Sequence, residues 1–374
     1  MKIALVHDWL TGMRGGEKCL EVLCRRFPGA PLFTLLHRPG SVSRVIENRP
    51  LAVSGLQRVP GITRHYRYFL PLMPRAIERL KIPADVDLVV SFSHAVAKGI
   101  LTPPGVPHVC YCFTPMRYAW DLREDYFGRP SNSLVKRPWQ FLRGKLLDRV
   151  REWDKASSQR VTHFVAISQA IADRIAASYG RESQIIYPPV DTTFYTPADV
   201  PREDFYLCVS ALVPYKRVDL AIEACNKMNR RLIVIGNGPQ QKRLARLAGP
   251  TVSLLGWLAD EDIRGHYRRC KALLFPGHED FGIVPVEAQA CGAAVIAFRK
   301  GGTLETVRPP IGDTPGTGLF FDEQSVNSLC RAMAELESNP ESVSSAACRQ
   351  QAEPFATERY ERELLALLER AAAR

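Results

Sequence analysis

Two glutamates in the second half of the chain lie on either side of a predicted helix N-terminus. Glu279 follows the apolar run 272–275, which reads as a buried strand, and Glu287 lies within a helix whose first turn suits Pro285. Gly282, between them, allows a ligand to approach the backbone. Free N–H groups at such a helix N-terminus bind phosphate. Two carboxylates do not neutralise a phosphate, so we expect them to accept hydrogen bonds from sugar hydroxyls.

The cations for such a site come from an earlier segment, Pro214-Tyr215-Lys216-Arg217. This segment follows the first predicted strand of the second half and opens the next helix. Ligands of doubly wound sheets bind at the carboxyl ends of the strands. A Lys-Arg pair most often lies on the surface without a binding role. At this position, however, Lys216 and Arg217 are suited to neutralise a diphosphate leaving group.

The spacing of Glu279 and Glu287 in a Glu-x-Phe-Gly context resembles the paired-glutamate signature of family 4 retaining glycosyltransferases, which have the two-Rossmann GT-B fold. Other glycine-containing segments resemble that family's phosphate loop, its Gly-x-Gly-Pro turn, its base-binding segment and its late glycine pair. In chain order, these segments contain Gly15 and Gly16, Gly236 and Gly238, Gly256, and Gly301 with Gly302. The resemblance extends over nearly the whole chain.

The resemblance implies a role for each of these residues. Glu279 orients hydroxyls of the transferred sugar, Glu287 holds the nucleotide ribose, and Lys216 and Arg217 balance the diphosphate. The backbone of Phe281, Gly282, Ile283 and Val284 contributes further donors, and the glycines 15, 16, 236, 238 and 256 approach the donor. The family retains configuration by same-face attack and needs neither a metal nor a cofactor beyond the nucleotide sugar.

Within the family, the sequence resembles the polysaccharide and O-antigen branch, which contains many mannosyltransferases. The segments that carry this resemblance are Asp8–Leu10, Gly15–Lys18, Thr114–Asp121 and Pro214–Arg217. The branch implies GDP-mannose as the donor and a polyprenyl-diphosphate-linked glycan as the acceptor. A UDP-sugar-dependent transferase of the same fold is the alternative.

The sequence departs from the family pattern at two places. Ala211 replaces an arginine that many relatives carry shortly before the lysine, and Phe113 replaces a histidine that precedes Thr-Pro in many relatives. His94 follows another predicted strand and is a candidate acceptor contact, although a histidine in this position is more often structural. Asp8 and Arg117 are the other acceptor candidates, and Asp8 is equally suited to cap a loop.

Strand-like apolar runs alternate with helical segments along the chain, which predicts parallel sheets with crossover helices. We therefore expect an α/β protein with two doubly wound Rossmann-like domains facing a cleft. The prolines 188 and 189 mark the boundary, because paired prolines favour extended backbone. The predicted domains are 1–187, which binds the acceptor, and 188–356, which binds the nucleotide sugar. A C-terminal helix, 357–374, crosses back to the first domain.

The net charge of +11 lies entirely in the first part of the chain. Residues 1–200 contain 28 Lys and Arg against 17 Asp and Glu, whereas residues 201–374 contain 22 of each. This imbalance predicts an anionic partner, here a membrane surface rather than nucleic acid, or simply a solvated surface. The sequence has no signal peptide core and no run of about 18 apolar residues. We therefore expect a cytoplasmic protein, peripheral on the inner face of the membrane.

The segment 136–153 has the pattern of a basic amphipathic helix. Its stripe contains Trp139, Leu142, Leu146, Val150 and Trp153, and the remaining faces contain several lysines and arginines. Such a helix either lies at an anionic membrane interface or docks its stripe on its own domain. The segment Arg64–Pro71 mixes bases and aromatics in the same way.

Three other classes of protein are weighed against this interpretation. A sugar-nucleotide epimerase or phosphorylase shares the fold but not the Glu279–Glu287 pair. A non-catalytic nucleotide or nucleic-acid binding protein is compatible with the basic first half and with Phe113. A dinucleotide dehydrogenase is disfavoured, because no GxGxxG follows the first strand. The ten scattered cysteines indicate buried thiols in a reducing compartment rather than a disulfide framework.

Overall fold

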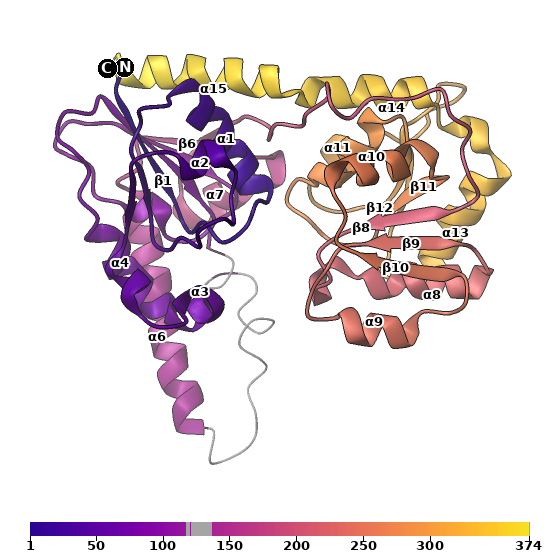
Figure 1. The fold of residues 1–374 in the computed structure, drawn as a ribbon, viewed down its shortest axis with the longest axis horizontal. Helices are drawn as coiled ribbons and strands as arrows, with labels where there is room; N and C mark the ends of the chain where they lie inside the picture. Colours follow the sequence, from indigo (N-terminus) through magenta and orange to yellow (C-terminus); the bar gives the residue numbers. More distant parts are fainter. Residues whose placement is uncertain (117–119, 121–136, 374) are drawn as a thin grey trace. The chain divides into compact units, whose positions relative to one another are not determined.

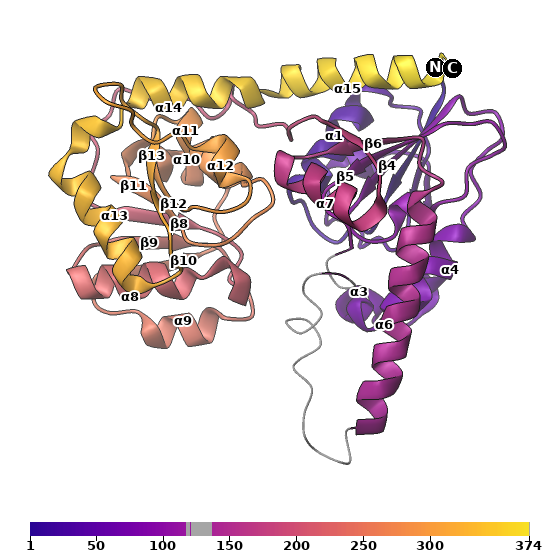
Figure 2. The ribbon, with the colours of Figure 1, turned by 180° about the vertical axis from the view of Figure 1, so that it is seen from behind.

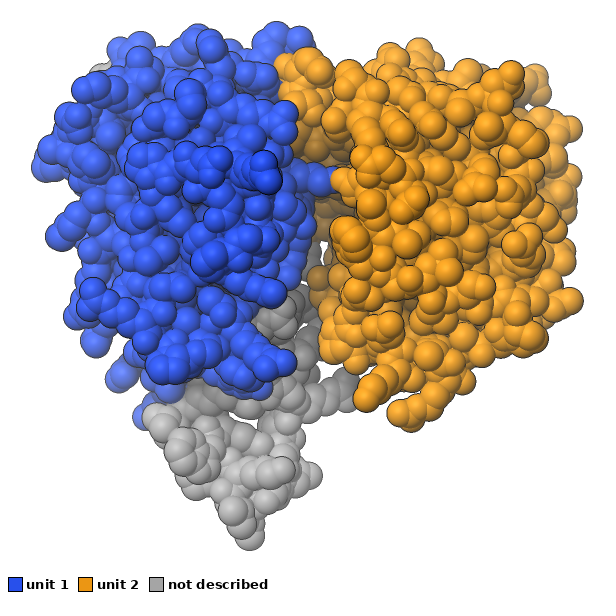
Figure 3. All heavy atoms as spheres, viewed as in Figure 1, with its two compact units in different colours: residues 1–187, 360–374 blue, residues 188–359 orange. Residues whose placement is uncertain are grey.

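The computed structural model describes residues 1–116, 120 and 137–373, and for residues 67 and 137–143 it describes the backbone only. The chain forms two compact units, shown in different colours in Figure 3. Unit 1 contains residues 1–187 and 360–374, and unit 2 contains residues 188–359.

Unit 1 is built on a seven-stranded parallel sheet with the strand order β3-β2-β1-β4-β5-β6-β7 (Figure 1). Its strands are β1 Ile3–His7, β2 Leu32–Thr34, β3 Leu51–Val53, β4 Leu88–Ser93, β5 His108–Cys112, β6 His163–Ala166 and β7 Ser183–Ile185. Its α-helices are α1 Gly15–Arg26, α2 Arg44–Glu47, α3 Ile62–His65, α4 Met73–Glu78, α6 Arg137–Ser158, α7 Gln169–Tyr179 and α15 Thr357–Ala372. The 3-10 helices are η1 Gly55–Arg58, η2 Tyr66–Leu72 and η3 Ala97–Gly99.

Unit 2 repeats the architecture with six parallel strands in the order β10-β9-β8-β11-β12-β13. Its strands are β8 Tyr206–Val209, β9 Leu232–Ile235, β10 Val252–Gly256, β11 Ala272–Phe275, β12 Ala294–Phe298 and β13 Gly318–Phe321. Its α-helices are α8 Val218–Met228, α9 Gln241–Leu247, α10 Asp260–Arg269, α11 Ile283–Ala290, α12 Thr303–Thr306, α13 Val326–Ser338 and α14 Ser345–Ala352. The 3-10 helices are η4 Pro214–Lys216, η5 Pro340–Ser342 and η6 Glu353–Phe355.

Both strand orders are those of doubly wound nucleotide-binding sheets, which confirms the predicted fold class. In each sheet the order reverses beside the first strand, between β1 and β4 in unit 1 and between β8 and β11 in unit 2. Ligands of such sheets bind where the order reverses, at the carboxyl ends of the strands. The loops after these four strands are therefore the places to look for a site.

Each sheet is covered by helices on both faces, as Figures 1 and 2 show from opposite sides. In unit 1, side chains from β1 and β4 pack with α3, η2, α4 and α6 on one face. On the other face, α15 packs through Tyr360, whose ring lies 5.5 Å from that of Tyr111 and whose hydroxyl donates to the Cys19 carbonyl. The C-terminal helix thus ends as part of unit 1, although its first residues, 357–359, belong to unit 2.

The described part of the helix α6 packs on its own unit through Leu147, Val150 and Trp153. Val150 is buried in the unit 1 core, and Trp153 packs against that core and donates its indole N–H to Glu78 at 2.8 Å. The membrane alternative for this helix is therefore wrong for Trp153. The side chain of Trp139 lies outside the described residues.

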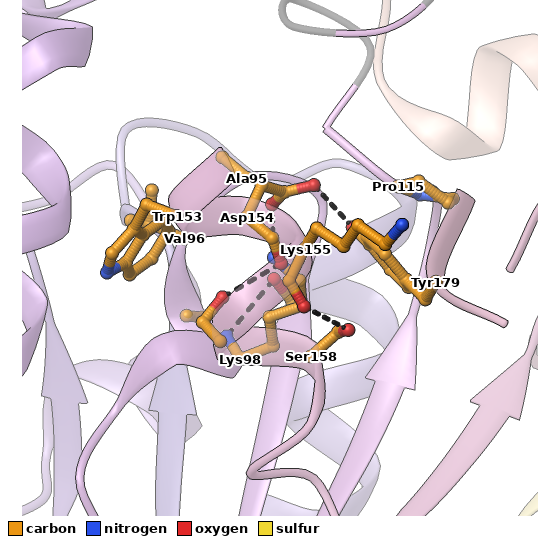
Figure 4. Close-up of polar contacts among 12 residues, drawn as sticks. Ala95, Val96, Lys98, Pro115, Trp153, Asp154, Lys155, Ser158 and Tyr179 are labelled. Atoms are coloured by element: carbon orange, nitrogen blue, oxygen red, sulfur yellow. Dashed lines mark hydrogen bonds and ion pairs between the residues drawn. The ribbon is translucent and has the colours of Figure 1, made fainter. Parts of the chain in front are cut away.

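A buried carboxylate, Asp154, ties α6 to the rest of unit 1 (Figure 4). It forms an ion pair with Lys98 from η3, and both side chains are essentially unexposed. Its Oδ2 also accepts hydrogen bonds from the Tyr179 hydroxyl at 2.7 Å and from the Trp120 indole at 2.9 Å. Three separate segments therefore meet on one charge, which the sequence alone did not indicate.

The first helix begins with a backbone cap from Glu17, whose Oε2 accepts from the Arg14 N–H at 3.1 Å. Glu17 is buried, and burial raises the pKa of its carboxyl from 4.5 to about 7. The folded carboxyl, beside the N-terminus of α1, therefore becomes neutral as the pH falls below about 7.

We expect Asp154→Asn to destabilise the protein by about 3 kcal/mol, because the variant leaves the buried Lys98 ammonium without its counter-charge. Chemical denaturation followed by tryptophan fluorescence measures this. Asp148→Asn, on an exposed part of the same helix, is the matched control and should shift the midpoint little. Equal shifts for the two variants would contradict the assigned role of the ion pair.

We also expect the stability difference between wild type and Glu17→Gln to depend on pH. The unfolded chain releases the Glu17 proton near pH 4.5 and the folded chain near pH 7. The stabilisation from the neutral carboxyl is therefore complete below pH 4.5 and is lost as the pH rises to about 7. The total change is on the order of 3 kcal/mol. Denaturation of both proteins across this range tests the effect, and a pH-independent difference would refute it.

Candidate functional site

In unit 2, the loops after β8 and β11 meet through an ion pair between Lys216 and Glu279. Lys216 ends η4, and Glu279 lies between β11 and α11. The two side chains are mostly buried, with 16% and 21% of their surface exposed. The pair lies where the strand order of the sheet reverses, so the structure brings together the two residues on which the sequence interpretation most depends.

Three glycines allow the Glu279 loop to pack against its neighbours, the loop after β8 and the loop after β12. A Cβ on Gly277 would lie 3.0 Å from the Lys216 Cα, and a Cβ on Gly302 would overlap the Phe281 backbone. The Gly302 N–H donates to the Glu279 carbonyl at 3.0 Å, and Gly301 pairs with Glu279 as an isolated bridge. The late glycine pair therefore supports the Glu279 loop from the β12 side.

The helix α11 begins directly after this loop. Gly282 precedes it with φ +88°, a conformation that favours glycine, and Phe281 is buried beneath the turn. The N–H groups of Ile283 and Val284 belong to the first turn, where an α-helix offers no intrahelical acceptor. The predicted strand, glycine loop and helix N-terminus are all present in the structure.

Glu287 lies one turn further into α11 and is 6% exposed. Its Oε2 accepts a hydrogen bond from the Tyr267 hydroxyl of α10 at 3.3 Å. Burial, followed by the charge of Glu287, raises the pKa of Tyr267 well above its ordinary range. Sequence reasoning missed Tyr267, and the only signal for it was its position four residues after Ile263 on an otherwise polar helix.

Arg217 points to a different partner. It adopts a left-handed backbone, φ 51° and ψ 38°, and its Nε donates to Asp219 at 3.2 Å within the first turn of α8. Its charge is thus matched by its own acid, and the structure places Lys216, rather than Arg217, beside Glu279.

The glycines 236 and 238 have a structural reason for lacking a side chain. A Cβ on Gly236 would overlap the Ser210 carbonyl, and one on Gly238 would overlap the Leu212 carbonyl. The turn after β9 therefore packs directly on the loop after β8. Gly256 ends β10 with φ +74°, and its carbonyl accepts from the Gly236 N–H at 2.7 Å. These glycines shape the loop that carries Lys216.

In unit 1, Asp8 lies at the corresponding edge but is fully buried. Its carboxylate accepts four backbone N–H groups, those of residues 94, 95, 96 and 97, at 2.6 to 2.9 Å. The expectation that Asp8 contacts an acceptor is therefore corrected. It caps the loop after β4, because its oxygens are already occupied by that backbone.

His94 is held by the same carboxylate, with its Nδ1 3.1 Å from Asp8 Oδ2, and 28% of its side chain remains exposed. Burial lowers the pKa of His94. Its ring packs edge-on against Trp9 at 4.5 Å. His94 is thus an oriented histidine at the sheet edge, whereas Arg117 lies outside the described residues.

The N-terminus of α1 packs beside these residues. A Cβ on Gly16 would lie 3.2 Å from the Phe113 ring and 3.5 Å from His7 Nε2. The Nδ1 of His7 lies 3.0 Å from the Trp9 carbonyl, and burial lowers the pKa of His7 to about 4. Phe113, which departs from the family pattern, therefore packs against the glycine loop. Gly15 opens the helix next to Gly16.

Among the described residues, no group of three or more His, Cys, Asp or Glu side chains is arranged to hold a metal ion. Within the same residues, no helix is long and apolar enough to cross a membrane.

Two family models match most of the chain. The model for Glycosyltransferase Family 4 matches residues 13–194, and the model for Glycosyl transferases group 1 matches residues 197–353.

Curated relatives match part of the chain. A GDP-mannose-dependent alpha-(1-6)-phosphatidylinositol monomannoside mannosyltransferase from Mycobacterium tuberculosis is 29% identical over 201 residues, 46% of this chain and 51% of the relative. A GDP-mannose-dependent monoacylated alpha-(1-6)-phosphatidylinositol monomannoside mannosyltransferase from Corynebacterium glutamicum is 30% identical over 205 residues, 46% of this chain and 52% of the relative. The chain thus spans about half the length of the curated relatives it matches.

Solved structures share the fold over the full length. Anabaena HepE in complex with UDP has a TM-score of 0.71 at 18% identity, covering 99% of this chain and 100% of the other. Sucrose-phosphate synthase from Thermosynechococcus elongatus has a TM-score of 0.72 at 15% identity and covers 100% of both chains. The two family models, which together match most of the chain, show that it belongs to the family 4 and group 1 glycosyltransferases, and the paired sheets and the solved structures show the GT-B fold.

Proposed function

We propose that this chain is a retaining hexosyltransferase that transfers mannose from GDP-mannose to a lipid-linked glycan acceptor in cell-surface polysaccharide synthesis. The observation that carries the proposal is the Lys216–Glu279 pair, half-buried where the strand order of the unit 2 sheet reverses. Mannose and GDP are supported by the two mannosyltransferase relatives. The lipid-linked acceptor rests on the sequence resemblance to the polysaccharide branch.

The proposed roles follow from the contacts in unit 2. Lys216 neutralises the departing diphosphate, and the first-turn N–H groups of α11 add donors of fixed direction. Glu279 accepts hydrogen bonds from the transferred sugar once Lys216 turns to the phosphates. Glu287, oriented by Tyr267, holds the ribose hydroxyls. The leaving phosphate accepts the acceptor proton on the same face. Because Lys216 and the first-turn N–H groups of α11 neutralise the diphosphate, the proposed reaction needs no metal.

In unit 1, His94 is the proposed acceptor contact, because it is oriented and partly exposed. Asp8 acts through it as a positioning group. We further propose that the protein works in the cytoplasm at the inner face of the membrane, where a polyprenyl-diphosphate-linked acceptor is present.

The first test is calorimetric titration of GDP, GDP-mannose, UDP and UDP-glucose into wild type and Glu287→Gln. We expect the guanine nucleotides to bind more tightly. The variant should weaken them about 10-fold to 100-fold, because it replaces a charged hydrogen bond to the ribose. Glu335→Gln, exposed on α13, is the matched control and should bind like wild type. Tighter binding of UDP would replace the donor assignment, and no binding of any nucleotide would refute the enzyme proposal.

The second test separates the two members of the ion pair. Lys216→Met should lower the rate of donor hydrolysis about 100-fold to 1,000-fold, because it removes charge stabilisation of the leaving group. Glu279→Gln should also lower the rate but should bind GDP at least as tightly as wild type, because Lys216 no longer has a competing carboxylate. Lys242→Met, exposed on α9, is the control. Weaker GDP binding by Glu279→Gln would contradict the assigned roles.

A further inference from the structure

The segment from Ile62 to Arg79 in unit 1 has two faces of opposite character. It comprises α3, η2 and α4, which lie beside α6 in both Figures 1 and 2. One face packs into the unit 1 core through Ile62, Tyr66, Leu70, Met73 and Ile77. The other face, here called the outward stripe, consists of His65, Tyr68, Leu72, Arg75 and Arg79. Members of the outward stripe follow one another at spacings of three and four, and all five are exposed.

Two large apolar side chains at the centre of the outward stripe are open to solvent. Tyr68 is 81% exposed, the largest value among the large hydrophobic side chains of the described residues, and Leu72 is 50% exposed. The rings of His65 and Tyr68 lie 6.5 Å apart, so these two side chains share one side of the segment. Exposed apolar groups that gather on one face mark an interaction surface.

The segment that carries the outward stripe has a net positive charge. Residues 62–79 contain four arginines and one acid, Glu78. Glu78 is engaged by Arg160 at 2.6 Å and by the Trp153 indole at 2.8 Å. Arg75 and Arg79 therefore flank Leu72 without an acid of their own segment competing for them.

This arrangement fits an anionic lipid surface better than a nucleic acid. Tyrosine and leucine insert among lipid headgroups, while arginines alongside them bind the phosphates. Nucleic-acid binding depends on phosphate contacts and gains little from an exposed leucine. We propose that the outward stripe docks unit 1 on an anionic phospholipid bilayer. This rests on the proposed function, whose acceptor is lipid-linked, and assigns the membrane contact to the outward stripe.

The test is sedimentation of the full chain with vesicles of phosphatidylcholine mixed with phosphatidylglycerol, and with vesicles of phosphatidylcholine alone. Wild type should bind the anionic vesicles only. Tyr68→Glu combined with Leu72→Glu should weaken this binding at least about tenfold, because charge enters the apolar centre of the contact. Leu304→Glu combined with Ile311→Glu is the matched control, since these exposed residues of unit 2 lie outside the outward stripe and should leave binding unchanged.

A second pair of variants tests the charge. Arg75→Gln combined with Arg79→Gln should weaken anionic-vesicle binding by about fivefold per residue, and the loss should shrink at high salt. Lys242→Gln combined with Arg331→Gln, both exposed on unit 2, removes the same charge and should have little effect. Equal losses for the two pairs would show that only net charge matters and would overturn the proposal.

Other outcomes also decide whether the outward stripe docks on a bilayer. Wild-type-like vesicle binding by the Tyr68 and Leu72 variant would overturn it. So would loss of oligonucleotide binding in the arginine variant without vesicle binding in wild type, which would make the surface a nucleic-acid contact. Calorimetric titration of GDP into the Tyr68 and Leu72 variant should match wild type. If no nucleotide binds wild type, the transferase proposal fails, whereas the vesicle result still tests the outward stripe.

Discussion

The ion pair between Lys216 and Glu279 is the interaction on which the candidate site depends, because it joins the loops that leave the unit 2 sheet after β8 and β11. The backbone around it is built for that contact. Gly277 lies against Lys216, the glycines 301 and 302 lie against the Glu279 loop, and Gly236 lies against the loop after β8. A larger residue at any of these positions would push the loops apart. The arrangement of the site therefore depends on close backbone packing at these glycines.

Unit 1 also joins the two loops that flank the reversal of its strand order, but through different chemical groups. Asp8 joins the loops after β1 and β4, but its partners are four backbone N–H groups rather than a side chain. Backbone donors are fixed by the fold and cannot turn toward a ligand. A lysine on a flexible stem can exchange a carboxylate for a phosphate. This difference explains why the buried acid of unit 1 is structural, while the half-buried acid of unit 2 is suited to substrate.

The sequence was most informative where a pattern ran long enough to show its period. The strand β11 has the predicted bounds, 272–275, whereas β2, β3 and β7 were not predicted, because three residues are too few to show a period. Asp8 and Glu279 each follow a buried strand. What distinguishes the capping role of Asp8 from the ligand-facing role proposed for Glu279 is the partner of each side chain, which is distant in sequence. The role of Trp153 likewise depends on Glu78, 75 residues earlier. A local sequence pattern therefore predicts where helices and strands lie, whereas the partners of a side chain depend on how the helices pack on the sheet.

The uneven charge of the chain affects the two proposed contacts, nucleotide binding in unit 2 and membrane docking by the outward stripe, in different ways. Residues 201–374 have balanced charge, 22 basic against 22 acidic, although the proposed donor is an anion. Nucleotide binding in unit 2 must then depend on short-range donors, namely Lys216 and the first turn of α11, rather than on a long-range field. The excess of 28 basic over 17 acidic residues lies in residues 1–200, where the outward stripe is found. A field of this kind acts over about 8 Å at physiological salt, which suits an extended anionic surface better than a small ligand held in a loop.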